Sequence, residues 1–118
     1  MGYESRLYVC EKTNVLGLSG RRWYEVIASI NLSKIGEIST KMRGYPATNG
    51  FIFADDGNTE IFEDDYGDPL NEIPIEEAID ILQNASDKQY RRFKPCLELL
   101  KGFNRTEWRE LVVLHYGY

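Results

Sequence analysis

The chain has 118 residues, a length typical of one domain, and its 42% hydrophobic and 13% aromatic content argues against disorder. Its two cysteines, Cys10 and Cys96, lie far apart without CxxC spacing, so neither a disulfide scaffold nor a zinc site is indicated. No apolar run is long enough for a membrane helix and no signal peptide is recognisable, so the expected compartment is the cytoplasm.

The charges are sorted along the chain. The 44 residues between Arg43 and Lys88 contain no Lys or Arg, yet they hold 12 of the 19 acids. The flanks are basic, and the formal net charge is −5. A field of this size can steer partners and select them by sign.

Two strands are predicted first. Residues 3–11 alternate, with Leu7 and Val9 on one face and Tyr8 and Cys10 on the other. Residues 13–20 form a glycine-containing loop, and residues 22–31 alternate again, with Tyr24, Val26, Ala28 and Ile30 sharing one face. The two strands are expected to pair as a hairpin.

The middle of the chain is predicted to hold a second hairpin. Residues 32–42 fit a short helix, although Gly36 and the β-branched run after it count against one. Two β-rich runs within residues 51–63 flank Asp56-Gly57, and a glycine at such a turn accepts a positive φ without strain.

Two helices and a strand complete the prediction. Pro74 opens the first helix, with Ile75, Ala78, Ile79 and Leu82 on its apolar face. Asp87 caps the second, which Pro95 should kink or divide and Gly102 should end. A short turn is expected at 104–108, and residues 111–116 form a buried, central strand. The fold class is α+β, as one domain over residues 1–118: a mostly antiparallel sheet of about five strands, with two or three helices on one face.

The acidic turns suggest two functions. Calcium binding would need an EF-hand spacing, which fails because apolar residues stand at ligand positions. The alternative is a negative surface that imitates nucleic-acid phosphates and occupies a basic partner. A solvated acidic turn that aids solubility is the plain interpretation. The candidate partner-binding residues are Asp55, Asp56, Glu60, Glu63, Asp64, Asp65, Tyr66 and Asp68.

Residues 88–94 are basic with interleaved aromatics. They could form a helix that contacts phosphates through Lys88, Arg91, Arg92 and Lys94, or an amphipathic helix whose basic face meets water or an acidic neighbour. His115, the only histidine, sits in an apolar run that favours a packed side chain. No catalytic, metal or cofactor motif is present, so no enzyme, metal site or cofactor is predicted.

Three strings, at residues 1–9, 54–61 and 112–118, resemble small uncharacterised proteins of phages and prophages of Gram-positive bacteria. Such proteins include inhibitors of host defence nucleases, anti-CRISPR proteins among them. The resemblance implies a phage setting, and this setting favours the interpretation of the acidic surface as a binding module that covers the nucleic-acid-binding surface of a basic host protein. The alternatives are a nucleic-acid-binding accessory protein that uses the basic helix, or a small metal-dependent regulator or enzyme.

Overall fold

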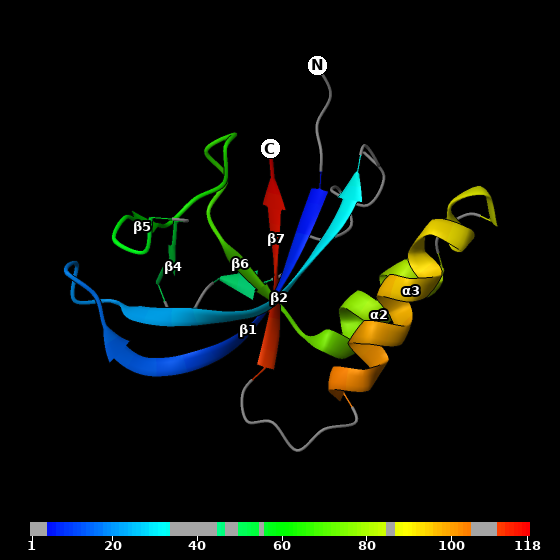
Figure 1. Ribbon diagram of the computed structural model, residues 1–118, viewed down its shortest axis with the longest axis horizontal. Coiled ribbons are helices and arrows are strands. Elements are labelled where there is room, and N and C mark those ends of the chain that lie inside the picture. Colours follow the sequence, from blue (N-terminus) through cyan, green and yellow to red (C-terminus); the bar gives the residue numbers. More distant parts are fainter. Residues whose placement is uncertain (1–4, 34–44, 47–49, 55, 85–86, 105–110) are drawn as a thin grey trace.

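The computed structural model describes residues 5–33, 45–46, 50–54, 56–84, 87–104 and 111–118 (Figure 1). Its strands and helices, in chain order, are β1 (Ser5–Leu16), β2 (Arg22–Ser33), β3 (Tyr45–Pro46), β4 (Ile52–Phe53), β5 (Glu60–Ile61), β6 (Asn71–Ile73), α2 (Ile75–Gln83), α3 (Asp87–Asn104) and β7 (Leu111–Gly117). The turn expected at 104–108 and most of the helix expected at 32–42 lie outside the described residues. Leu32 and Ser33, at the start of the range 32–42, belong to β2.

A sheet in the strand order β2-β1-β7-β6-β3 forms the centre of the fold, and its neighbouring strands are antiparallel. The last strand, β7, lies between β1 and β6, and it pairs with β1 from Ser5↔Gly117 to Glu11↔Leu111. A strand with neighbours on both sides and layers on both faces favours a continuous apolar run, and residues 112–114 are all buried. The predicted α+β class, the antiparallel sheet and the central C-terminal strand are confirmed.

Both described helices pack against one face of this sheet (Figure 1). Helix α2 begins directly after Pro74, and Glu76 and Glu77 in its first turn complement the helix dipole. The four predicted core positions of α2 are buried. They form one cluster with residues of β1, β7 and α3, namely Leu7, Val9, Val113, Leu97 and Leu100.

Helix α3 differs from its prediction in two respects. It runs from Asp87 to Asn104 with Pro95 inside it, so the proline does not divide the helix. It also continues two residues beyond Gly102, the predicted stop. The buried side chains of Leu97 and Leu100 lie after the proline, and their packing stabilises the helix beyond the missing N–H group. Among the described residues, neither helix is long and apolar enough to cross a membrane.

The opposite face of the sheet is covered by a small separate sheet made of β4 and β5. Gly57 in the turn between them has φ +74°, as its predicted role requires, although each strand is only two residues long. Strand β4 is held against β2 where the Tyr24 N–H donates to the Phe51 carbonyl at 2.8 Å. The ring of Phe53 packs edge-on against Trp23 at 5.2 Å.

A β-bulge changes the predicted pattern of β2. Val9 lies opposite Ala28, but the next residue, Cys10, lies opposite Val26, so Ile27 is an extra residue in β2. Cross-strand partners share a face of the sheet, and Val9 and Cys10 lie on opposite faces. Val26 and Ala28 therefore point to opposite faces, and the prediction that they share one is wrong.

Candidate functional site

The acidic segment, which we define as residues 56–68, crosses the face of the sheet opposite the helices (Figure 1). It includes the β4–β5 turn, strand β5 and the loop that follows. All but one of the predicted partner-binding residues lie in it, while Asp55 is outside the described residues. The structure divides these residues into those whose carboxylates hold the fold together and those whose side chains face outward.

Asp56 organises the β4–β5 turn. Its carboxylate accepts hydrogen bonds from the Asn58 N–H at 2.8 Å, the Thr59 N–H at 2.9 Å and the Thr59 hydroxyl at 2.6 Å. These bonds favour the ionised form, and they lower the pKa of Asp56 from 3.8 to about 2, with the Thr59 hydroxyl as the largest cause. Although Asp56 is exposed, most of its acceptor capacity serves its own turn.

Glu60 connects the acidic segment to the tip of the β1–β2 hairpin. Its Oε1 accepts the backbone N–H of Leu18 at 2.6 Å. The backbone approaches so closely here that a side chain on Gly17 would collide with Glu60 and with the ring of Phe51. This carboxylate therefore also has a local structural partner.

Asp64 is buried, with 7% of its surface exposed. One of its carboxylate oxygens accepts the N–H groups of Tyr66 at 2.8 Å and Asp68 at 3.0 Å, which forms the loop. The other oxygen accepts the N–H of Gly117, at the end of β7, at 3.2 Å. A buried charge needs such partners, so Asp64 fixes the loop to the central strand.

Two further bonds join the loop to the end of the chain. The Tyr116 hydroxyl donates to the Asp65 carboxylate at 2.7 Å, and the Tyr66 hydroxyl donates to the Tyr118 carbonyl at 3.3 Å. The pKa of Tyr116 is raised above its usual value, first by burial and then by its bond to Asp65. A neutral hydroxyl is what this donor role requires.

Three of the predicted contact residues remain directed outward. Glu63 and Asp68 are exposed, and Tyr66 is 54% exposed. No side-chain hydrogen bond or ion pair of Glu63 or Asp68 is found within the described part of the chain. Together they give the acidic segment two exposed carboxylates and a half-exposed aromatic ring.

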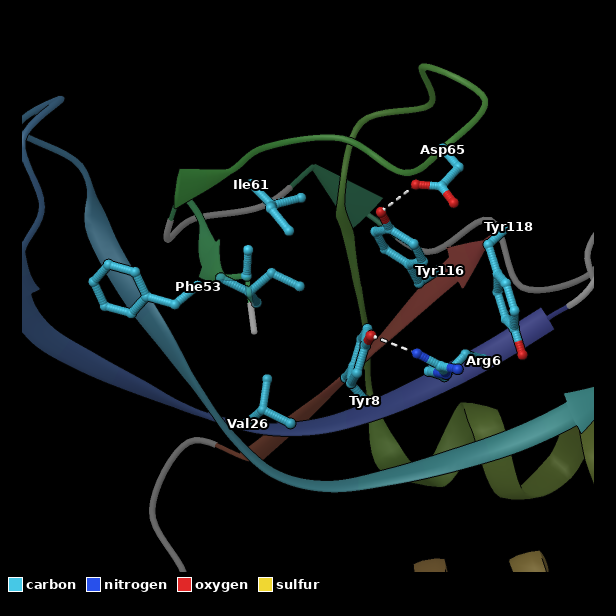
Figure 2. Close-up of a pocket in the computed structure, with 10 residues that line it drawn as sticks. Arg6, Tyr8, Val26, Phe53, Ile61, Asp65, Tyr116 and Tyr118 are labelled. Carbon is cyan, nitrogen blue, oxygen red and sulfur yellow. Dashed lines mark hydrogen bonds between the residues drawn. The ribbon is translucent and has the colours of Figure 1, made fainter. Parts of the chain in front are cut away.

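Beside the acidic segment lies an open cleft of about 350 Å³, which we call the tyrosine cleft (Figure 2). Its polar side chains come from β1, from β7 and the residue after it, and from the loop that follows β5. Its apolar side chains come from β2, from β4 and the residue after it, and from β5. The polar lining consists of Arg6, Tyr8, Asp65, Tyr116 and Tyr118. The apolar lining consists of Val26, Ile52, Phe53, Ala54 and Ile61.

Arg6 is the cation of the tyrosine cleft. It donates to the Tyr8 hydroxyl at 3.3 Å, and its guanidinium carbon lies 4.5 Å from the centre of the Tyr118 ring. The hydrogen bond to Tyr8 is the main cause that raises the pKa of Arg6. The rings of Tyr8 and Tyr116 meet edge to face at 5.8 Å, so neighbouring side chains hold both tyrosines in place.

Sequence inspection missed Arg6, Tyr8, Tyr116 and Tyr118 as site residues. Their alternation predicted that Arg6 and Tyr8 share a face, but nothing in the sequence predicted that β1 and β7 pair. That pairing places Tyr8 opposite Leu114 and Arg6 opposite Tyr116. A signal was present in the alternate positions of the two segments, where Arg6 and Tyr8 share one face and Tyr116 and Tyr118 share another.

The predicted basic segment lies in α3, on the helical face of the sheet and away from the acidic segment (Figure 1). Lys94 is exposed. The side chains of Lys88, Arg91 and Arg92 lie outside those that the structure describes. Residues 56–68 therefore lie on the other face of the sheet from this helix, whereas α2, which carries Glu76 and Glu77 of the same acidic stretch, packs in one cluster with α3.

The remaining groups considered for chemistry are packed in the protein. Cys10 is buried and free, and burial raises its pKa; Cys96 is half-buried and free, and its pKa is raised for the same reason. Burial lowers the pKa of His115, while Asp64 and Asp68 act in the opposite direction. Within the described ranges, no group of three or more His, Cys, Asp or Glu side chains could hold a metal ion.

No protein-family model, no curated protein and no solved structure matches this chain.

Proposed function

We propose that this chain is a protein-binding module and that its contact surface is the outward side of the acidic segment, formed by Glu63, Tyr66 and Asp68. The observation that carries this proposal is the anchoring of that loop by the buried Asp64 carboxylate through three backbone N–H groups. A loop fixed in this way presents its exposed side chains in one arrangement. Less conformational entropy is then lost on binding.

The composition of this surface favours a basic protein as the partner. Tyrosine is enriched among residues that dominate interface energies, and the half-exposed Tyr66 shares the acidic segment with the exposed carboxylates of Glu63 and Asp68. Carboxylates attract a cationic surface over a screening length of about 10 Å at 0.1 M salt, which mainly accelerates association.

The partner class that we propose is a nucleic-acid-binding host protein, such as a defence nuclease. Its phosphate-binding surface carries the required positive charge. The chain would occupy that surface in the cytoplasm of the host and inhibit the partner, without catalysing a reaction itself. The resemblance to small phage proteins supports this role.

The test is capture of partners from a nuclease-treated bacterial lysate, followed by competition with duplex DNA. We expect the captured protein to bind nucleic acid, and we expect DNA to displace this chain from it. A partner that binds both at once would contradict the proposal. Direct binding of DNA by the chain, with a steep salt dependence, would instead favour the basic residues of α3.

A pair of matched variants tests the surface. Glu63→Gln with Asp68→Asn removes two exposed charges from the acidic segment. Glu25→Gln with Glu98→Gln removes two exposed charges elsewhere, and each variant moves the net charge from −5 to −3. The first should slow association and flatten its salt dependence, while the second should have little effect. Equal effects would show that total charge, and not this surface, controls binding.

A further inference from the structure

The tyrosine cleft has a polar end and an apolar end. Figure 2 shows Arg6 and Tyr118 on one side, Val26, Phe53 and Ile61 on the other, and Tyr8 and Tyr116 between them. Ligand sites typically combine an apolar wall with a few fixed polar groups that orient the ligand. The volume of about 350 Å³ lies at the small end of such sites, which suits a ligand of one or two rings.

Hydrogen-bonding and ring contacts hold the positively charged Arg6 in position, and no ion pair of Arg6 is found among the residues that the structure describes. Arg6 is held by the Tyr8 hydroxyl and the Tyr118 ring, and neither of these carries a negative charge. The ion pair found among the described residues joins Lys12 to Glu72 and does not involve Arg6. The cleft's own carboxylate, Asp65, accepts the Tyr116 hydroxyl. A guanidinium with unused donors matches a carboxylate or phosphate in its geometry.

The surroundings limit how many charges the ligand can carry. The acidic segment forms one rim of the cleft through Asp65, and the exposed Glu63 and Asp68 belong to the same segment. These carboxylates repel a polyanion such as DNA or RNA, whose binding needs many cationic contacts. One arginine in this setting selects a small ligand with a single anionic group.

We propose that the tyrosine cleft is a binding site for a small aromatic anion, in which Arg6 receives a carboxylate or phosphate group and the apolar wall receives the ring. Tyr8 and Tyr116 offer ring edges and faces to a planar ligand, and Val26 and Ile61 offer aliphatic contacts. The site is separate from the protein-binding surface proposed above, because Glu63, Tyr66 and Asp68 do not line it.

The experiment is a titration of the full chain, followed by calorimetry and by NMR shifts, with two pairs of probes. Phenylacetate is compared with phenylacetamide, and adenosine monophosphate with adenosine, so that each pair differs in charge at similar shape. We expect one anion to bind at least about tenfold more tightly than its neutral counterpart, because a charge-assisted bond to Arg6 is lost in the latter. The pair that shows this difference identifies the anion as a carboxylate or a phosphate.

Variants then assign the effect to Arg6. Arg6→Gln should weaken binding of the preferred anion by about tenfold or more and leave binding of its neutral counterpart unchanged. Arg6→Lys, which keeps the charge but not the planar fork, should retain part of the affinity. Arg22→Gln is the control, because it removes an exposed arginine from β2 that does not line the cleft. Melting curves establish that each variant is folded.

Three results would overturn the proposal. The first is that neither anion binds with a Kd below about 1 mM. The second is that charged and neutral probes bind equally, or that Arg6→Gln and Arg22→Gln behave alike. The third is that a single-stranded oligonucleotide binds the cleft more tightly than either small anion, which would make nucleic acid the occupant. The variants Glu63→Gln and Asp68→Asn should leave ligand binding intact, so failure here is distinguishable from failure of the protein-binding proposal.

Discussion

The hydroxyl of Tyr116 donates to the carboxylate of Asp65 at 2.7 Å, although the two residues are 51 positions apart in the chain. This bond joins the central strand to the acidic segment and forms part of the wall of the tyrosine cleft. The acidic residues of this segment therefore fall into two groups. The carboxylates of Asp56, Asp64 and Asp65 accept hydrogen bonds within the fold. Those of Glu63 and Asp68 are exposed to solvent.

Asp64 should matter to stability far more than its neighbour Asp68. Asp64→Asn replaces an oxygen that faces the Gly117 N–H with an NH2 group, and we expect the free energy of unfolding to fall by about 1–3 kcal/mol. Asp68→Asn removes the same charge from an exposed site and should change it by less than about 0.5 kcal/mol. Chemical denaturation measures both. Equal losses would mean that the removed charge, and not the buried hydrogen-bond acceptor, determines the change in the free energy of unfolding.

The turn at Gly57 gives a test of backbone conformation. Its φ of +74° is strained for any side chain, although there is open space around the position. Gly57→Val should lower the free energy of unfolding by about 1–2 kcal/mol, while Gly57→Asn should cost less because Asn tolerates this region. Thermal melts of the two variants give the comparison. An unchanged melting temperature for the valine variant would contradict the positive φ of Gly57.

The low pKa of Asp56 should depend on Thr59. Thr59→Val keeps the shape but removes the hydroxyl that donates at 2.6 Å, so the pKa should rise from about 2 toward 3.8. Because the folded pKa is depressed, the stabilisation is complete above about pH 4 and is lost as the pH falls through 2. Carboxyl NMR titration of both proteins measures the shift. An unchanged pKa would assign it to the backbone donors alone.

His115 should produce a separate pH dependence. Burial lowers its folded pKa below 6.5, so the unfolded chain binds more protons in the window between the two values. The free energy of unfolding should therefore decrease as the pH falls below about 6.5, and it should level off below the folded pKa. Asp64 and Asp68 reduce this effect. His115→Gln should flatten the profile in that window, and a profile unchanged by this substitution would contradict the mechanism.

Core packing can be tested at Leu114. It is 0% exposed on the central strand, so Leu114→Ala should lower the free energy of unfolding by about 2–5 kcal/mol. Leu99→Ala is the matched control, because Leu99 is 41% exposed on α3. It should cost much less. Similar losses at both positions in denaturant titrations would mean that Leu114 is not part of the packed core.

Local patterns in the sequence predicted the elements well. The spacing of Ile75, Ala78, Ile79 and Leu82 is enough to identify the buried face of α2, and an Asp-Gly pair is enough to predict the turn at Gly57. Such features depend on neighbours within a few residues. The bulge at Ile27 could not be predicted, because it is visible only in the register between two strands.

The candidate site was predicted only in part, for a physical reason. A sequence gives the number of carboxylates, but it does not show that the Asp64 carboxylate accepts a hydrogen bond from the N–H of Gly117, 53 residues away. The tyrosine cleft likewise combines Arg6, Asp65 and Tyr116 through long-range strand pairing. Alternation in the sequence predicts on which face of a strand each side chain lies. Which side chains of other strands lie beside it depends on how the strands pair, and the sequence pattern does not show that pairing.

The position of β7 has a consequence for the synthesis of the protein. Strand β1 is synthesised before its inner neighbour β7, and β2 to β6 and both helices lie between them in the chain. While translation proceeds, the β1–β2 hairpin carries the unpaired edge that β7 later fills. Such an edge can pair with other chains, and closing so long a loop slows folding to on the order of milliseconds to seconds. The sheet can thus be completed only after β7 has been synthesised, and chaperones that cover nascent strands should increase the yield of folded protein.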